Sequence, residues 1–264
     1  MTIRDSWTED PRPHELPHYR TLLDGTDWAS LGTARGTGES LPTALKGLLS
    51  PDPVVRSAAI GVALGEVTHQ NTIYQATVPV ALYVAAILNH PVIVAGDVVR
   101  VAGMPPHRPA LVVLLEWLGD TAYDADDECV AIAERYCDEG CPDECCRQIR
   151  VFRDVRPAVF SGVRPLLGHD NPDVRDAALV AAIPLAEHPV LTAHRAELVD
   201  RARRLLATST HRRRRYRVLD AMKAWGHDTG GLENADEAEA RRLRARRMAE
   251  RNSWTGGYSE DPPF

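Results

Sequence analysis

The sequence predicts an all-α protein, a right-handed α-α superhelix of about five helix pairs, and three observations support that prediction. A stretch of eight residues occurs twice, as DPVVRSAA at 52–59 and NPDVRDAA at 171–178. The copies lie 119 residues apart, which is about three units of a helical repeat of ~40 residues. No segment shows sustained alternation of apolar and polar residues, so we expect almost no sheet.

Each copy of the repeated stretch has the residues of a helix start. Asp52 and Asn171 can act as N-caps, accepting hydrogen bonds from free backbone N–H groups. Pro53 and Pro172 then occupy the first helical position, where a missing N–H does no harm. We therefore expect a helix to begin at each of these prolines.

Apolar residues at helical spacing follow each start and predict a buried face. The residues expected on it are Val55, Ala58 and Val62 in the first copy and Val174, Ala177 and Ala181 in the second. Arg56 and Arg175 flank these faces, where each can donate to a neighbouring carboxylate or carbonyl.

Apolar periodicity predicts further helices along the chain. The segments are 77–90, 92–103, 108–122, 126–137, 142–167, 192–209, 212–226 and 235–252. We expect a loosely ordered N-terminal segment at 1–20, the helical array at 21–252 and a polar C-terminal tail at 253–264, because Pro, Gly and polar residues dominate both ends.

Composition is that of a soluble globular protein, with 44% hydrophobic and 26% charged residues. The first twenty residues lack the apolar core of a signal peptide. No apolar run approaches the ~20 residues that cross a bilayer. We therefore expect a cytoplasmic protein with reduced cysteines and no membrane partner.

Charge is unevenly distributed along the chain. Between residues 195 and 251, fifteen arginines and one lysine outnumber nine acids, so this region carries +7 and the remainder −13. A basic C-terminal region and an acidic remainder predict a polarised surface, and the acidic part suits a basic partner.

The two repeat copies resemble HEAT repeats, as LLSPDPVVRSAAI at 48–60 and LLGHDNPDVRDAALVAAI at 166–183. The segments 27–53, 69–88 and 218–229 extend the resemblance to bacterial HEAT-repeat proteins of GC-rich genomes. The stretch GTARGTGES at 32–40 departs from a regular helix and turn, which predicts an irregular first repeat. The resemblance implies a HEAT-like α-solenoid with a concave binding surface.

Five cysteines lie within eighteen residues: Cys129, Cys137, Cys141, Cys145 and Cys146. Their spacings approach those of a zinc site, which needs four ligands, usually in close pairs. Small apolar residues around a helix–turn–helix are the alternative, and we favour it. We therefore expect no metal and no cofactor.

A polar stretch at 69–77 joins two apolar helices. Its side chains suit hydrogen bonding to a partner protein, but a turn between helices needs capping groups in any case, and we favour that interpretation. The best candidates for partner binding are His69, Gln70, Thr72, Tyr74 and Gln75.

Two charged clusters complete the candidate sites. The acids Asp124, Asp126 and Asp127 precede a helix; we favour a solvated helix start as their explanation, but they could also extend a partner-binding surface. The arginines of the second cluster are Arg212, Arg213, Arg214, Arg215 and Arg217. They could bind phosphates or pair with the acidic part of the chain, which we favour.

The sequence contains no nucleotide-binding loop, nucleophile elbow or zinc-protease motif, so we expect a binding protein rather than an enzyme. Resemblance to immunity-type HEAT proteins implies an immunity or antitoxin protein that neutralises a partner, such as a toxin domain with a basic surface. The alternatives are a nucleic-acid-binding protein similar to HEAT-like DNA glycosylases, with Trp117 and Asp120 nearest to their site pattern, and a scaffold subunit.

Overall fold

The computed structural model describes residues 15–99, 107–127, 129–131 and 143–253. They form a mostly helical protein, which confirms the all-α prediction. Contacts divide the chain into two compact units, Met1–Ala202 and Arg203–Phe264, with the division inside helix α12 (Arg195–Thr208). None of the described helices combines the length and apolar character needed to cross a bilayer.

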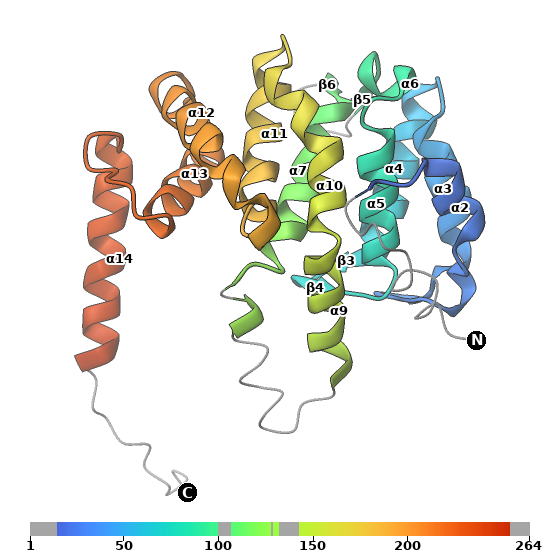
Figure 1. Cartoon of the computed structure of the whole chain (residues 1–264), viewed down its shortest axis with the longest axis horizontal. Helices are drawn as coiled ribbons and strands as arrows, with labels where there is room; N and C mark the ends of the chain where they lie inside the picture. Colours follow the sequence, from blue (N-terminus) through green and yellow to red (C-terminus); the bar gives the residue numbers. More distant parts are fainter. Residues whose placement is uncertain (1–14, 100–106, 128, 132–142, 254–264) are drawn as a thin grey trace, which may run out of the picture. The chain divides into compact units, whose positions relative to one another are not determined.

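Helices supply most of the described elements (Figure 1). The α-helices of unit 1 are α2 (Tyr19–Gly25), α3 (Leu41–Leu48), α4 (Pro53–Val67), α5 (Thr77–Ile87), α6 (Pro91–Val94), α7 (Ala110–Tyr123), α9 (Asp143–Asp154), α10 (Arg156–Val163) and α11 (Pro172–Leu185). Short 3₁₀ turns are η1 (Trp28–Ser30), η2 (Gly38–Ser40), η3 (Arg164–Gly168) and η4 (Pro189–His194). Unit 2 contains α13 (Arg212–Ala224) and α14 (Ala235–Ser253).

Both copies of the repeated stretch start a helix, as predicted. The Asp52 carboxylate accepts a hydrogen bond from the Val54 N–H at 2.8 Å, and the Asn171 side chain accepts one from the Asp173 N–H at 2.9 Å. Each cap satisfies a backbone donor that the helix cannot satisfy itself.

Histidine is the N-cap of four other helical segments. The Nδ1 atoms of His18, His90 and His188 each accept a hydrogen bond from the backbone N–H two residues later, at 3.3 Å. His211 caps α13 in the same way, through the Arg214 N–H at 3.4 Å. An imidazole nitrogen with a free lone pair thus takes the place of the usual hydroxyl or carboxylate oxygen.

Three small antiparallel ribbons, with strands of two or three residues, interrupt the helices of the described chain, which agrees with the expectation of almost no sheet. They pair β1 (Gly32–Thr33) with β2 (Gly36–Thr37), β3 (Thr68–His69) with β4 (Thr72–Ile73), and β5 (Asp97–Val99) with β6 (His107–Pro109). The first ribbon lies where the sequence predicted an irregular repeat.

The helix predicted at 92–103 is wrong over its described part, 92–99, and residues 100–103 lie outside the described ranges. The structure has the single turn α6 and then strand β5. Gly96 marks the change, because a Cβ there would lie 2.3 Å from the Val92 carbonyl oxygen. The β-branched Val98 and Val99 that follow favour a strand.

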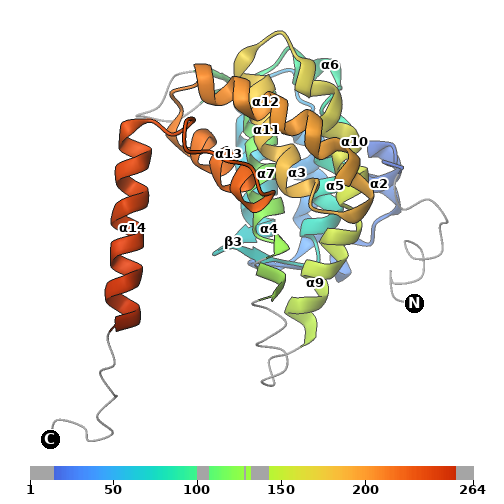
Figure 2. The same cartoon turned by 60° about the vertical axis from the view of Figure 1, so that its left-hand side comes forward.

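Unit 1 is built from helices that pack in neighbouring pairs. Helix α11 lies along α7, and α10 lies along α5 (Figure 1 and Figure 2). The α7–α11 approach is close, because a Cβ on Gly119 would lie 3.1 Å from the Ala181 Cα atom. Helix α4 packs on α3 and beside β5. This packing agrees with the predicted all-α class.

The predicted buried face is present in the second copy and absent from the first. Val174, Ala177 and Ala181 are buried in α11, as expected. In α4, Val55 and Val62 are 48% and 47% exposed and Ala58 is exposed too, so that part of the prediction is wrong.

The residues of α4 that form its buried face are Arg56, Ala59, Ile60, Ala63, Leu64 and Val67. The sequence of α4 is apolar all round, so helical periodicity alone did not identify which side the rest of the chain covers.

Candidate functional site

The polar stretch predicted as a turn forms a two-residue hairpin between α4 and α5. Thr68 pairs with Ile73 and His69 with Thr72. Gln70 and Asn71 connect the strands with φ of 50° and 60°. Positive φ at both central residues is typical of a type I′ turn, whose twist matches that of the strands, and Asn accepts this conformation readily.

The base of the hairpin is fastened to its surroundings. The Gln75 side chain accepts a hydrogen bond from the Gly32 N–H at 2.8 Å, which ties it to the first ribbon. The Thr77 hydroxyl donates to the Val67 carbonyl at 2.7 Å and accepts from the Tyr74 N–H at 2.9 Å. Tyr74 and Gln75 are only half-exposed.

The tip of the hairpin is therefore the part open to solvent. His69, Gln70 and Asn71 are exposed, whereas Thr72 is half-buried. We call His69, Gln70 and Asn71 the hairpin tip. Asn71 was missing from the sequence candidates, although its tolerance of positive φ was a signal for it.

The predicted acidic residues surround a buried arginine. Arg156 is fully buried; it donates to the Ala122 carbonyl at 3.3 Å, to the Ala125 carbonyl, and to the Glu187 carboxylate at 3.3 Å. Burial lowers the pKa of Arg156 and raises the pKa of Glu187, because both charges lose water.

Each of the three predicted acids makes a contact of its own, separate from the Arg156–Glu187 pair. The Asp126 carboxylate accepts from the Cys129 N–H at 2.8 Å, and Asp127 forms an ion pair with Arg153 at 2.5 Å. Asp124 ends α7, with its N–H bonded to the Asp120 carbonyl. Asp127 is exposed and the other two are half-exposed, so the cluster offers a partner less free charge than its composition indicates.

The predicted arginine cluster lies in unit 2 and separates into two groups. Arg214 and Arg215 are 5% exposed, Arg217 is half-buried, and Arg212 and Arg213 are exposed. Arg215 donates to the Glu237 carboxylate at 2.7 Å and 2.9 Å, and to the Leu232 carbonyl at 3.0 Å. These hydrogen bonds lower the pKa of Glu237.

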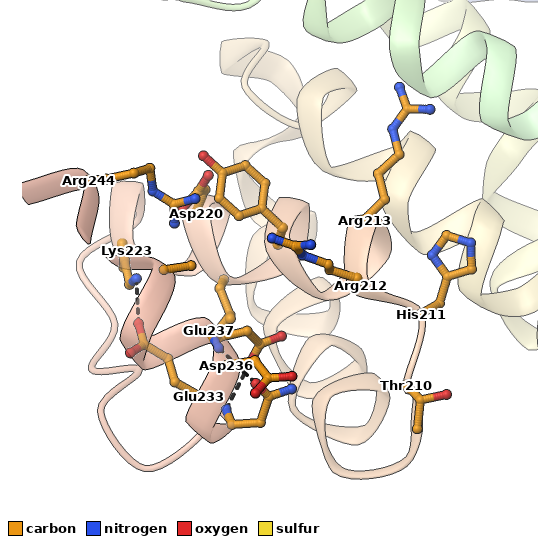
Figure 3. A pocket seen from close by; sticks show the side chains of 14 residues that line it. Thr210, His211, Arg212, Arg213, Asp220, Lys223, Glu233, Asp236, Glu237 and Arg244 are labelled. Carbon is orange, nitrogen blue, oxygen red and sulfur yellow. Dashed lines mark hydrogen bonds and ion pairs between the residues drawn. The ribbon is translucent and has the colours of Figure 1, made fainter. Parts of the chain in front are cut away.

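Glu237, which pairs with Arg215, lies on α14. It therefore belongs to the basic region at 195–251 and not to the acidic part of the chain, with which we expected these arginines to pair. The same part of unit 2 contains an open cavity of about 640 Å³ between α13 and α14 (Figure 3). Arg212, Lys223, Asp220 and Glu233 are among its lining residues, so charges of both signs face it. Such a mixed lining is a poor match for a polyanion.

Trp117 and Asp120, the residues nearest to a glycosylase pattern, both lie on α7 and are half-buried. The Trp117 indole donates to the Thr68 hydroxyl at 3.3 Å, so it contacts the hairpin base. The arrangement therefore gives the tryptophan a packing role.

The cysteine cluster is described only in part. Cys129 is half-buried, and its thiol lies 3.6 Å from the Tyr123 carbonyl. Cys137 and Cys141 lie outside the described residues, and for Cys145 and Cys146 only the backbone of α9 is described. Over the described ranges, no three His, Cys, Asp or Glu residues are placed to hold a metal ion.

Comparisons with protein-family models, with curated proteins and with solved structures found no match for this chain.

Proposed function

We propose that this chain is a HEAT-like, partner-binding protein without catalytic activity, of the immunity type that binds and neutralises another protein. The hairpin tip is the observation that supports this function. It exposes three polar side chains on a backbone fixed by strand pairing and by the Gln75 and Thr77 hydrogen bonds. A surface that is already ordered loses little entropy on binding.

The distribution of charge supports a basic partner. The chain outside residues 195–251 carries −13, and a surface of one sign speeds the association of an oppositely charged protein. A toxin domain with a basic surface, such as a nuclease, has the required chemistry.

Paired variants test the hairpin tip. His69→Ala combined with Gln70→Gly removes two side chains, and the glycine keeps the positive φ that the turn requires. Affinity capture from native cells should recover one partner with the wild-type chain. Purified partner should then bind the double variant with about 1–3 kcal/mol less free energy, with an unchanged melting temperature.

Tyr74→Ala is the matched control, because Tyr74 is half-buried at the hairpin base. It should lower the melting temperature and leave the partner affinity unchanged. Equal affinity of wild type and the tip variant would remove the hairpin from the binding site.

The nucleic-acid alternative has less support. Two of its five arginines are buried, and Arg215 is engaged by Glu237 and backbone carbonyls. Phosphate binding would then depend on Arg212 and Arg213, which is few contacts for tight binding at physiological salt.

A further inference from the structure

The cavity between α13 and α14 is lined by charges of both signs in equal number (Figure 3). Four of its lining residues are arginine or lysine, and four are aspartate or glutamate. All of them belong to unit 2, and the volume of about 640 Å³ is in the range of ~300–1,000 Å³ that is typical of small-ligand sites. A ligand that matches this lining carries both charges and is close to neutral overall.

Two of the four acids are already neutralised by cations of the protein. Glu233 accepts a hydrogen bond from the Lys223 ammonium at 2.7 Å and another from the Arg241 guanidinium at 2.9 Å. Glu237 accepts two from Arg215, at 2.7 Å and 2.9 Å. Neither carboxylate therefore depends on a ligand for a partner.

Other charges that line the cavity have no such partner. The side chains of Arg212 and Asp220 on α13 are exposed, and neither forms a hydrogen bond or an ion pair with a described residue. Asp236 on α14 is unpaired within the described chain in the same way. These groups are available to a ligand, because no described residue uses their charge.

The unpaired charges of α13 have a defined spacing. Arg212, Tyr216 and Asp220 follow one another at intervals of four residues, and all three line the cavity. With a rise of about 1.5 Å per residue, the cation and the carboxylate are ~12 Å apart along the helix, and the tyrosine lies between them. An extended peptide of about four residues spans the same distance, at ~3.3 Å per residue.

The middle of the cavity offers apolar surface. Tyr216 is 40% exposed although the Arg244 guanidinium lies 4.7 Å from the centroid of its ring, so part of the ring stays open. Leu219 and Ala240 also line the cavity. Aromatic and aliphatic surface between two charges suits a ligand whose own middle is apolar.

We propose that this cavity binds a short, extended peptide through its free carboxylate at one end and its free ammonium group at the other. The carboxylate pairs with Arg212, whose planar guanidinium matches its geometry. The ammonium group pairs with Asp220, and the apolar middle of the peptide packs on Tyr216. The site belongs to unit 2, whereas the hairpin tip belongs to unit 1, so this binding function is distinct from the one proposed above.

Isothermal titration of the full chain with four tetrapeptides tests the proposal. All four have the sequence glycine–leucine–leucine–glycine. One has both termini free, one is acetylated at the N-terminus, one is amidated at the C-terminus, and one carries both modifications. The free peptide should bind with a Kd below about 1 mM. Each single modification should weaken binding about tenfold, because it removes one charged hydrogen-bond partner.

Two variants assign the ends of the peptide. Arg212→Gln should weaken binding of the free peptide about tenfold and leave binding of the amidated peptide unchanged. Asp220→Asn should weaken the free peptide equally and leave the acetylated peptide unchanged. Arg247→Gln is the matched control, because Arg247 is exposed on α14 and does not line the cavity. It should leave the affinity for all four peptides unchanged.

Three results would overturn the proposal. The first is a wild-type chain that does not bind the free peptide at millimolar concentration. The second is equal affinity for the free and the doubly modified peptide, because the apolar middle alone would then account for binding. The third is an Arg212→Gln or Asp220→Asn variant that circular dichroism shows to be folded and that binds the free peptide as tightly as the wild type.

Discussion

Helices α4 and α11 begin with nearly the same eight residues, yet their environments differ on one side. Both are capped by the residue before a proline, and both bury the side that holds Ala59 in α4 and Ala178 in α11. The opposite side is covered in α11 and open in α4. Local sequence therefore determined where these helices begin, and their neighbours determined which faces are buried.

The arginines of the two copies also share a local contact and differ in their neighbours. Arg56 donates to the Ser50 carbonyl at 2.7 Å, and Arg175 donates to the corresponding His169 carbonyl at 3.0 Å. This confirms that each can bond a neighbouring carbonyl. Arg56 also donates to the Asp97 carbonyl of β5 and is nearly buried, whereas Arg175 is half-exposed.

The largest expected difference between the copies follows from those contacts. Arg56→Ala should lower the free energy of unfolding by about 2–4 kcal/mol, because it leaves two carbonyls without their charged donor. Arg175→Ala should cost about 0.5–1 kcal/mol, because water can replace its contact. Urea unfolding of both variants measures the difference, and equal losses would contradict the distinction.

Exchanging residues between the copies should have a smaller effect. Ala181→Val gives α11 the residue of α4, and it should destabilise the protein by about 1–3 kcal/mol because Gly119 of α7 lies against Ala181. Val62→Ala makes the opposite exchange on the exposed face. It should change the free energy of unfolding by no more than about 0.5 kcal/mol.

The smallest expected difference concerns the caps. Asp52→Ala and Asn171→Ala should each cost about 1 kcal/mol, since each removes one side-chain acceptor for a backbone N–H. Thermal melts of the two variants should show nearly equal shifts. A clearly larger loss at Asn171 would mean that the covered helix depends on its cap beyond this hydrogen bond.

The helix starts and the turn at 69–77 could be predicted because they depend on residues close in sequence. The helix starts could be predicted from the cap residue and the proline after it, at 52–53 and 171–172. Burial of the α4 face could not be predicted, since it depends on whether another helix lies beside it. Strand β5 was missed because the change from helix to strand occurs at Gly96. A Cβ there would clash with the nearby Val92 carbonyl, and this contact is seen only in the folded chain.

The candidate sites were predicted less well than the fold, because residue type does not show where a charge is used. Asp127 was expected on a charged surface, and the structure pairs it with Arg153. Arg215 was expected to pair with the acidic part of the chain, but its partner Glu237 lies within the basic region at 195–251. Gln75 was a candidate partner contact, and it binds the Gly32 N–H instead. Among the residues predicted to bind a partner protein, His69, Gln70 and Asp127 have exposed side chains.

The histidine caps make four helix starts depend on an uncharged ring. An Nδ1 atom that accepts a hydrogen bond cannot hold the proton, so each neutral imidazole must carry its proton on Nε2. Each of these caps therefore leaves the ring's one N–H donor, at Nε2, to a group other than the backbone that it caps, whereas the carboxamide cap of Asn171 has two N–H donors beside its acceptor.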